Sequence, residues 1–143
     1  MKKILVIDDE PYVARLIGAA LKVAEVEHRV DYCSDGGQGR AKASQGQHDL
    51  ITLDLTMPLM DGIEALEEMK RNPKSRDIPV VVVTGHHDPA LHQRAMELGA
   101  AAVITKPFQL EELGNVFRQI LAGETVEPPP GAGLGPGLRP LGT

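Results

Sequence analysis

Polar residues of types suited to phosphate and metal chemistry end or follow short apolar runs of this chain. In chain order they are Asp8 and Asp9, Asp54, Thr84 and Lys106. Three carboxylates gathered within several ångströms repel one another by about 1 to 4 kcal/mol per close pair, so the pocket needs positive charge. The Lys106 ammonium supplies one charge, and a divalent ion such as Mg²⁺, which accepts carboxylates, waters and phosphate, supplies the rest. Such a pocket is arranged for phosphoryl transfer to a free carboxylate.

Five short apolar runs must position these groups. Their near-continuous apolarity and β-branched residues predict strands buried on both faces, as in a parallel sheet covered by helices. The carboxyl ends of parallel strands meet at one edge, where neighbours lie about 4.8 Å apart, so the polar groups there come within side-chain reach. The runs are Ile4–Ile7, Arg29–Cys33, Leu50–Leu53, Val80–Val83 and Ala101–Ile104.

Helical apolar patterns follow each of these runs. Pro11 suits the first turn of a helix, a weaker pattern covers Gly36–Ser44, and Asn72-Pro73 and Gly99 mark the ends of the third and fourth helices. The order is therefore a βα unit repeated five times. Right-handed crossovers fold such a chain into an open parallel sheet with helices on both faces, and ligands bind at the carboxyl ends of its strands.

Composition separates a folded body from a tail. The chain has 143 residues, 42% hydrophobic, with a net charge of −5. Ten of its 26 glycines and prolines lie in the last 17 positions. We therefore expect a domain over residues 1–123 and a flexible Pro/Gly-rich tail over residues 124–143. About 20 residues after the fifth helix are too few for an output domain, since even a stapled one needs about 40.

Charge and cysteine content exclude several classes of protein. An acidic body without a Lys/Arg cluster lacks the footprint of nucleic-acid binding. No segment approaches the roughly 20 apolar residues of a membrane span. The single cysteine, Cys33, cannot form an internal disulfide and sits in an apolar run, so we expect it in the core of a cytoplasmic protein.

Taken together, these motifs resemble the receiver domain of response regulators in two-component signalling. No single piece is specific, but their order and spacing over residues 3–121 are. The resemblance implies a flavodoxin-like (βα)5 doubly wound parallel sheet with strand order 2-1-3-4-5. The matching pieces are Ile7–Pro11, Leu53–Pro58 followed by Met60–Gly62, Val83–Gly85 and Lys106–Phe108.

The resemblance also implies a function and a cofactor. Asp54 would accept a phosphoryl group from the phosphohistidine of a histidine kinase or phosphotransferase, in a phosphorelay. Mg²⁺ would be held directly by Asp9 and Asp54, by Asp8 through water, and by the main-chain carbonyl of Thr56. The chain would be a stand-alone response regulator that changes its partner-binding face, and not an enzyme beyond its own phosphorylation and dephosphorylation.

By the same resemblance, Lys106 pairs with the phosphoryl oxygens and Thr84 turns inward to bond the phosphate. Lys106-Pro107 is expected to be a cis peptide. Val103 stands where the family often has a switching Tyr or Phe, and Gly85 where Ala is commoner. Signalling would then depend on the loop after Thr84 and the helix behind it, rather than on a threonine-to-aromatic relay.

Further roles follow from the same comparison. Thr56 and His86, two residues after Asp54 and Thr84, would tune water access to the acyl phosphate. The first helix and the loop after Lys106 would form the docking face for the phosphodonor, with Tyr12, Ala14 and Leu110 as contacts. We expect a monomer or weak dimer, with an unidentified downstream protein as partner and without direct binding to nucleic acid or membrane.

Several other interpretations stay open. The fold could serve as an adaptor that binds its partner without phosphorylation. A phosphoaspartyl hydrolase of the haloacid-dehalogenase type also uses an aspartate at a strand end, but it needs a second acid two residues later, where this chain has Thr56. Asp9 could instead be only a helix N-cap before Pro11. Both roles can coexist, and the metal role is favoured because Asp8 has no capping use.

The histidines are expected to be ordinary surface residues. His86, His87 and His92 match no zinc-site spacing and predict a solvated loop, while His28 and His48 precede strands.

Overall fold

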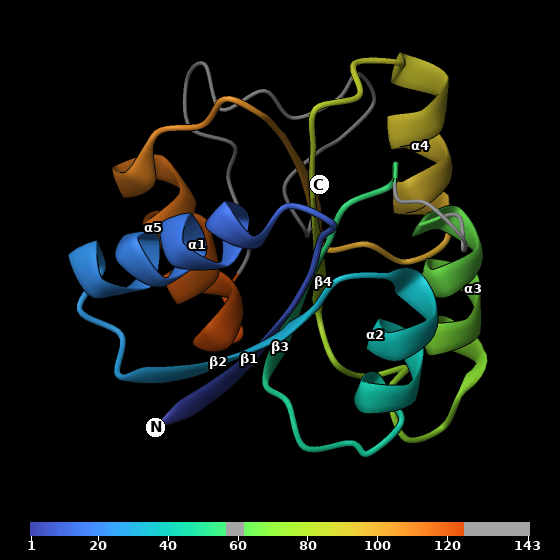
Figure 1. Ribbon diagram of the computed structural model, residues 1–143, viewed down its shortest axis with the longest axis horizontal. Coiled ribbons are helices and arrows are strands. Elements are labelled where there is room, and N and C mark those ends of the chain that lie inside the picture. The colour runs from blue at the N-terminus through green and yellow to red at the C-terminus, as the bar shows by residue number, and fades with distance from the viewer. Residues whose placement is uncertain (57–61, 125–143) are drawn as a thin grey trace.

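The computed structural model describes residues 1–56 and 62–124, in which five strands alternate with five helices (Figure 1). The motif pieces Met57-Pro58 and Met60-Asp61 and the tail from residue 125 lie outside the described residues. The strands are β1 (Lys2–Ile7), β2 (His28–Cys33), β3 (Leu50–Leu53), β4 (Val80–Thr84) and β5 (Ala102–Thr105). The helices are α1 (Pro11–Val23), α2 (Gly36–Ala43), α3 (Gly62–Arg71), α4 (Pro89–Glu97) and α5 (Leu110–Leu121).

All strand pairs are parallel, and the sheet order β2-β1-β3-β4-β5 confirms the expected topology. The strand bounds differ slightly from the apolar runs. β1 begins at the exposed Lys2, which pairs with His28 of β2, and β5 ends at Thr105. Main-chain hydrogen bonds define these ends, and they continue past the last apolar side chain, which is why apolarity alone misplaced them.

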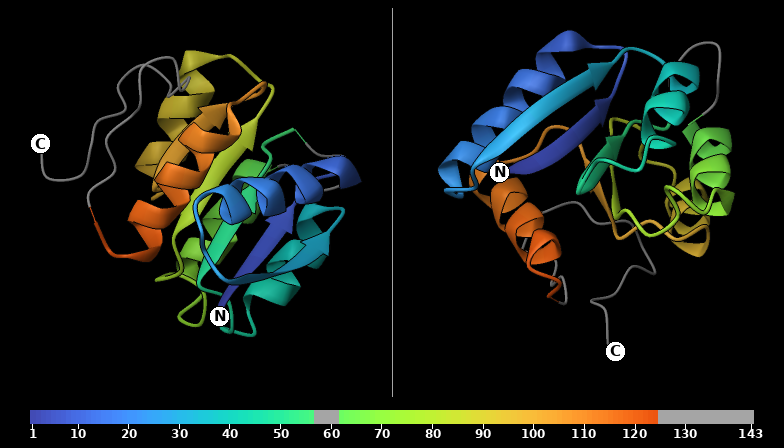
Figure 2. Two further views of the ribbon diagram at one scale, coloured as in Figure 1. Left: turned by 90° about the vertical axis from the view of Figure 1, so that its left-hand side faces the viewer. Right: turned by 90° about the horizontal axis from the view of Figure 1, so that it is seen from below.

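Successive residues of each strand face opposite sides of the sheet, so the core forms two layers. In β1, Ile4 and Val6 pack with α1 and α5, while Leu5 and Ile7 pack on the other side with α2, α3 and α4. The turned views show these two helix groups on opposite faces of the twisted sheet (Figure 2). Cys33 is buried beside Leu5 and Ile7, as expected. No helix in the described residues is long and apolar enough to cross a membrane.

Local residues define where several helices begin and end. The Asp88 carboxylate caps α4 by accepting the Ala90 N–H at 3.0 Å, with Pro89 in the first turn. Gly99 follows α4 with φ +107°, as a left-handed helix end requires. The N-cap of α1 is Glu10, so the reading of Asp9 as a cap was wrong.

His48 was wrongly expected at the surface. It is only 6% exposed, and its Nε2 lies 2.8 Å from Oδ2 of Asp31 in β2. The hydrogen bond from His48 lowers the pKa of Asp31, although partial burial opposes it. The position of His48 before a strand does not indicate that Asp31, 17 residues earlier, is its partner. The prediction of a surface histidine was wrong for this reason.

Candidate functional site

Two buried carboxylates lie side by side where β1 and β3 end. The Asp8 N–H donates to the Cys33 carbonyl at 3.1 Å, and the Asp54 N–H donates to the Ile7 carbonyl at 3.0 Å. These bonds extend the sheet one residue beyond each strand and hold both side chains at its carboxyl edge. Asp8 is 1% exposed and Asp54 4%. Such burial is rare for carboxylates unless they are paired, so the site must contain compensating charge.

Lys106 supplies the first compensating charge. Its Nζ lies 2.8 Å from Oδ2 of Asp8, 3.4 Å from Oδ2 of Asp54 and 3.7 Å from Oε1 of Glu10. Burial by itself would lower the pKa of Lys106, but the hydrogen bond to Asp8 and the charges of Asp54, Asp8 and Glu10 raise it above its usual value. The side chain is therefore a stable ammonium that bridges the two buried acids. The Lys106-Pro107 peptide is cis, as expected.

One ammonium does not balance this group of acids. Burial raises the pKa of Asp8, against the opposing effects of the Lys106 hydrogen bond and of the Glu10 N–H, which Asp8 Oδ1 accepts at 2.9 Å. The N–H that Asp8 accepts belongs to Glu10, the N-cap residue, which lies before the first residue of α1. A raised carboxyl pKa means that the folded protein pays to keep Asp8 ionised, and a further cation would relieve this cost.

The acids at the end of β1 offer oxygen ligands to such a cation. Asp8, Asp9 and Glu10 each contribute one carboxylate oxygen, and these oxygens lie within 4.8 Å of one another. Asp9 and Glu10 are exposed. A hard divalent ion takes such ligands together with water, so the residues present fit Mg²⁺. Glu10 was not among the expected ligands, and its place two residues after Asp8 was the only signal for it.

The Asp54 side chain is oriented by the residue two positions later. Its Oδ1 accepts both the N–H and the hydroxyl of Thr56 at 3.1 Å, while Oδ2 faces Lys106. Behind this turn, a Cβ on Gly62 would lie 2.5 Å from the Asp54 main-chain oxygen, so only glycine fits there. Thr56 thus donates a hydroxyl where a haloacid-dehalogenase-type enzyme needs an acid, which disfavours that alternative.

Tyr32 of β2 is a further part of the site, which its residue type and position in the sequence do not predict. Its hydroxyl donates to the main-chain carbonyl of Asp8 at 2.6 Å. This bond ties the end of β1 to the neighbouring strand and limits the movement of the acidic turn. An aromatic residue within a strand gave no sign of this role, because the contact joins residues 24 positions apart.

Thr84 completes the site at the end of β4, where it is fully buried. Its carbonyl accepts the Lys106 N–H at 2.8 Å, and its Oγ1 accepts the His86 N–H at 3.1 Å. Gly85, between Thr84 and His86 in the chain, is exposed, and a Cβ on it would meet no atom within 4 Å. Val103 is fully buried in the core below, so its side chain has no exposed position to switch from.

The prediction that His86, His87 and His92 lie in a solvated loop is only partly correct. His86 and His87 are exposed, but His92 is buried within α4 and its Nε2 lies 2.5 Å from the His86 carbonyl oxygen. Position 92 falls on the inner side of α4, next to the buried turn of Ala95, and the short loop brings a main-chain acceptor to it. Polar composition alone predicted solvent exposure and missed this contact.

A groove of about 400 Å³ opens beside Lys106, between α1 and the loop before α5. Tyr12 and Leu16 line one side and Phe108 and Leu110 the other, and both Tyr12 and Leu16 are exposed. The expected contact Ala14 is instead half-buried against the core.

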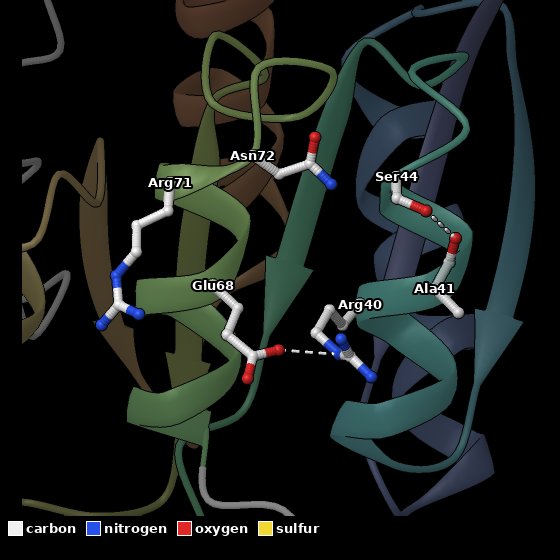
Figure 3. Close-up of a pocket in the computed structure, with 6 residues that line it drawn as sticks. All are labelled: Arg40, Ala41, Ser44, Glu68, Arg71 and Asn72. Carbon is white, nitrogen blue, oxygen red and sulfur yellow. Dashed lines mark hydrogen bonds and ion pairs between the residues drawn. The ribbon is translucent and has the colours of Figure 1, made fainter.

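A second hollow, of about 430 Å³, lies between the C-terminal halves of α2 and α3 (Figure 3). Arg40 crosses it to Glu68 at 2.8 Å. Arg71, also at this hollow, pairs with Glu67 at 2.9 Å. Because helices run back against the parallel strands, their C-terminal halves lie away from the carboxyl edge. This hollow is therefore separate from the acidic site.

Comparison with known proteins gives consistent matches. The sequence model of the response regulator receiver domain matches residues 4–118. The DNA-binding dual master transcriptional regulator RpaA of Synechocystis sp. is 36% identical over 121 residues, which cover 85% of this chain and 49% of that protein. The probable chemotaxis protein CheY of Rhizobium etli is 34% identical over 111 residues, covering 78% of this chain and 85% of that one. This chain thus spans about half the length of RpaA.

A solved structure matches as well. The receiver domain of the sensor histidine kinase PA1611 from Pseudomonas aeruginosa, which has a magnesium ion coordinated in its active-site cleft, superposes with a TM-score of 0.74. It is 25% identical, and the match covers 85% of this chain and 98% of that one.

Proposed function

Because this chain belongs to the response regulator receiver domain family, we propose that it is a stand-alone response regulator that accepts a phosphoryl group on Asp54. The observation that supports this most directly is the pairing of a buried Asp54 carboxylate with the Lys106 ammonium at 3.4 Å, next to a group of acids that fits a divalent cation. A carboxylate with a purely structural role needs only one partner. The Asp54 carboxylate instead lies beside both a positive charge and a group of further oxygen ligands.

In the proposed reaction, an Asp54 carboxylate oxygen attacks the phosphorus of a phosphohistidine. The oxygen–phosphorus bond of an acyl phosphate forms as the nitrogen–phosphorus bond breaks, and the electron pair leaves with the donor's imidazole. Lys106 pairs with the oxygens of the transferred group, and the Thr84 hydroxyl donates a hydrogen bond to one of them. The N–H and hydroxyl of Thr56 hold the Asp54 carboxylate in a fixed orientation during the attack.

Receiver domains bind Mg²⁺ at an acidic site, and the residues of this chain fit it. We assign Asp9 and Asp54 as direct ligands, Asp8 as a ligand through water, and the Thr56 carbonyl as the last protein ligand. The ion supplies positive charge that offsets the oxygens of the phosphoryl group. Among the described residues, Lys106 is the cation that pairs with the buried acids before the ion binds.

Two residues beside the site are proposed to set the lifetime of the acyl phosphate. Thr56 and His86 are both exposed and each contacts a site residue, Asp54 and Thr84 respectively. The Thr56 side chain contacts Asp54 directly, whereas His86 is held beside Thr84 by its main-chain N–H, so we propose that both residues border the path by which water reaches the phosphorus. Gly85 and the fully buried Val103 support a signal carried by the Thr84 loop and α4 instead of an aromatic side chain.

The groove between α1 and the loop after Lys106 is proposed as the docking face for a histidine kinase or phosphotransferase. It presents Tyr12, Leu16 and Leu110 immediately beside the ammonium that would meet the phosphoryl group. We propose that the protein acts in the cytoplasm as a monomer or weak dimer, and that phosphorylation changes its affinity for a downstream protein.

The test uses a small phosphodonor such as acetyl phosphate with Mg²⁺, followed by intact-protein mass spectrometry. We expect one added phosphoryl group on the wild-type protein and none on Asp54→Asn. No mass increase on the wild type, or the same increase on the variant, would reject the proposal. If a downstream partner binds equally with and without beryllofluoride, the chain is an adaptor that does not depend on phosphorylation.

A further inference from the structure

The loop that joins β4 to α4 is held at a single residue from two sides. The N–H of His86 donates to Oγ1 of Thr84 at 3.1 Å. The carbonyl of the same residue contacts Nε2 of His92, one turn into α4, at 2.5 Å. A carbonyl oxygen only accepts hydrogen bonds, so Nε2 of His92 must carry the hydrogen. A continuous chain of contacts therefore links Thr84 to α4.

His92 is built into the protein interior, unlike the other residues of this loop. It is 2% exposed, and its Nδ1 has no hydrogen-bond partner among the described residues. Its main chain is fixed too, because its N–H donates to the Asp88 carbonyl at 3.1 Å at the start of α4. A buried polar ring with only one of its nitrogens satisfied is costly, so the contact with His86 is the evident use of this side chain.

The rest of the loop is weakly restrained by packing. Gly85 lacks a side chain and has open space where a Cβ would be, and His86 and His87 are exposed. Within the described residues, the hydrogen bonds through His86 are therefore the main restraint on where this loop lies relative to Thr84.

We propose that His92 is a positioning residue that holds the loop after Thr84 in its unphosphorylated arrangement. The inference rests on the proposed function, in which the Thr84 hydroxyl turns toward a phosphoryl group on Asp54. That turn takes Oγ1 away from the His86 N–H, and a His86 carbonyl anchored on α4 resists the accompanying movement of the loop. The contact between His86 and His92 is thus present in the resting state and lost in the phosphorylated state.

The test compares beryllofluoride binding in the presence of Mg²⁺, measured from the amide NMR resonances of Thr84 and His86. His92→Leu has an apolar side chain of similar size and no donor, whereas His92→Gln keeps a donor. Losing a neutral hydrogen bond that exists only in the resting state should tighten binding about 2- to 10-fold in His92→Leu. His92→Gln should stay within about twofold of the wild type.

A matched control lies at the opposite edge of the sheet. The Nδ1 of His28 contacts the Val26 carbonyl at 2.8 Å at the start of β2, so His28→Leu removes the same kind of bond away from Thr84. It should bind beryllofluoride like the wild type. Equal or weaker binding by His92→Leu than by the wild type would overturn the inference, and so would equal tightening in His92→Gln, since packing would then be the cause.

A measurement on the wild type alone avoids any folding defect of the variants. The imidazole ¹⁵N resonances of His92 should show a hydrogen-bonded Nε2–H without beryllofluoride and its loss with beryllofluoride. Retention of that hydrogen bond in the bound protein would overturn the inference. If the wild type fails to bind beryllofluoride at all, or if Asp54→Asn binds it equally, it is the proposed function that fails.

Discussion

Replacing Lys106 with methionine should change two affinities in opposite directions. The ammonium lies 2.8 Å from an Asp8 oxygen and 3.4 Å from an Asp54 oxygen, and it occupies oxygens that a divalent cation would use. At 3.4 Å, one such ion pair is worth roughly 1 to 5 kcal/mol for effective dielectrics of 80 to 20. Removing this competitor should therefore tighten Mg²⁺ binding by about fivefold or more.

The phosphoryl mimic should respond in the other way. A hydrogen bond from a charged donor contributes about 1.5 to 3 kcal/mol, so Lys106→Met should bind beryllofluoride about 10- to 150-fold more weakly. Both affinities can be measured on one protein sample, with Mg²⁺ by calorimetry and beryllofluoride by NMR titration. Lys22→Met makes the same chemical change at an exposed position of α1 and should alter neither affinity.

Two results would refute this reasoning. Weaker Mg²⁺ binding in Lys106→Met would mean that the ammonium organises the acids for the ion instead of competing with it. Unchanged beryllofluoride binding would mean that Lys106 is a structural counter-ion that does not meet the phosphoryl group.

Two further changes test how the site is supported, and a third tests an ion pair elsewhere in the fold. Tyr32→Phe removes the hydroxyl that donates to the Asp8 carbonyl. We expect the free energy of unfolding in urea to fall by about 0.5 to 1.5 kcal/mol and Mg²⁺ binding to weaken. An unchanged Mg²⁺ affinity would contradict the role assigned to Tyr32. Gly62→Ala places a Cβ 2.5 Å from the Asp54 carbonyl oxygen. We expect this close contact to lower the free energy of unfolding by about 1 to 3 kcal/mol and to slow labelling by acetyl phosphate. A variant as stable as the wild type would contradict the close contact. The hydrogen bond from His48 lowers the pKa of Asp31, so its stabilisation is full above the ordinary carboxyl pKa and is lost as the pH falls through the lowered value. Urea unfolding between about pH 5 and about pH 3 should therefore show a smaller acid-induced loss in Asp31→Asn than in the wild type, and an equal loss would exclude this pair as a source of acid sensitivity.

The sequence predicted the sheet well because burial on both faces leaves a strong trace. Runs such as Ile4–Ile7 and Val80–Val83 are apolar at every position, and only strands between two helix layers need that. The weak pattern at α2 reflects its glycines, of which Gly39 leaves room for the side chain of Ile7. Strand ends were less accurate because exposed residues such as Lys2 still pair through the main chain.

The sequence predicts those parts of the candidate site that the order of the parallel strands brings together. It does not predict the parts that depend on one particular side-chain contact. Parallel strands must bring Asp8, Asp54 and Lys106 to one edge, and the structure places them there. The hydroxyl of Tyr32 and the ring of His92 act through main-chain carbonyls, which every residue has. Such partners leave no mark in the sequence, so they emerge only once the distances are known.

The ion pairs of Lys106 also determine when the site can exist during protein synthesis. Lys106 follows Asp8 by 98 residues and Asp54 by 52, and it stands at the end of the edge strand that is translated last. At about 5 to 20 residues per second, a ribosome needs roughly 3 to 10 s to add those 52 residues. For that interval a nascent chain carries the acidic residues without their counter-charge. The proposed ability to accept a phosphoryl group should therefore arise only in chains whose fifth βα unit has been translated.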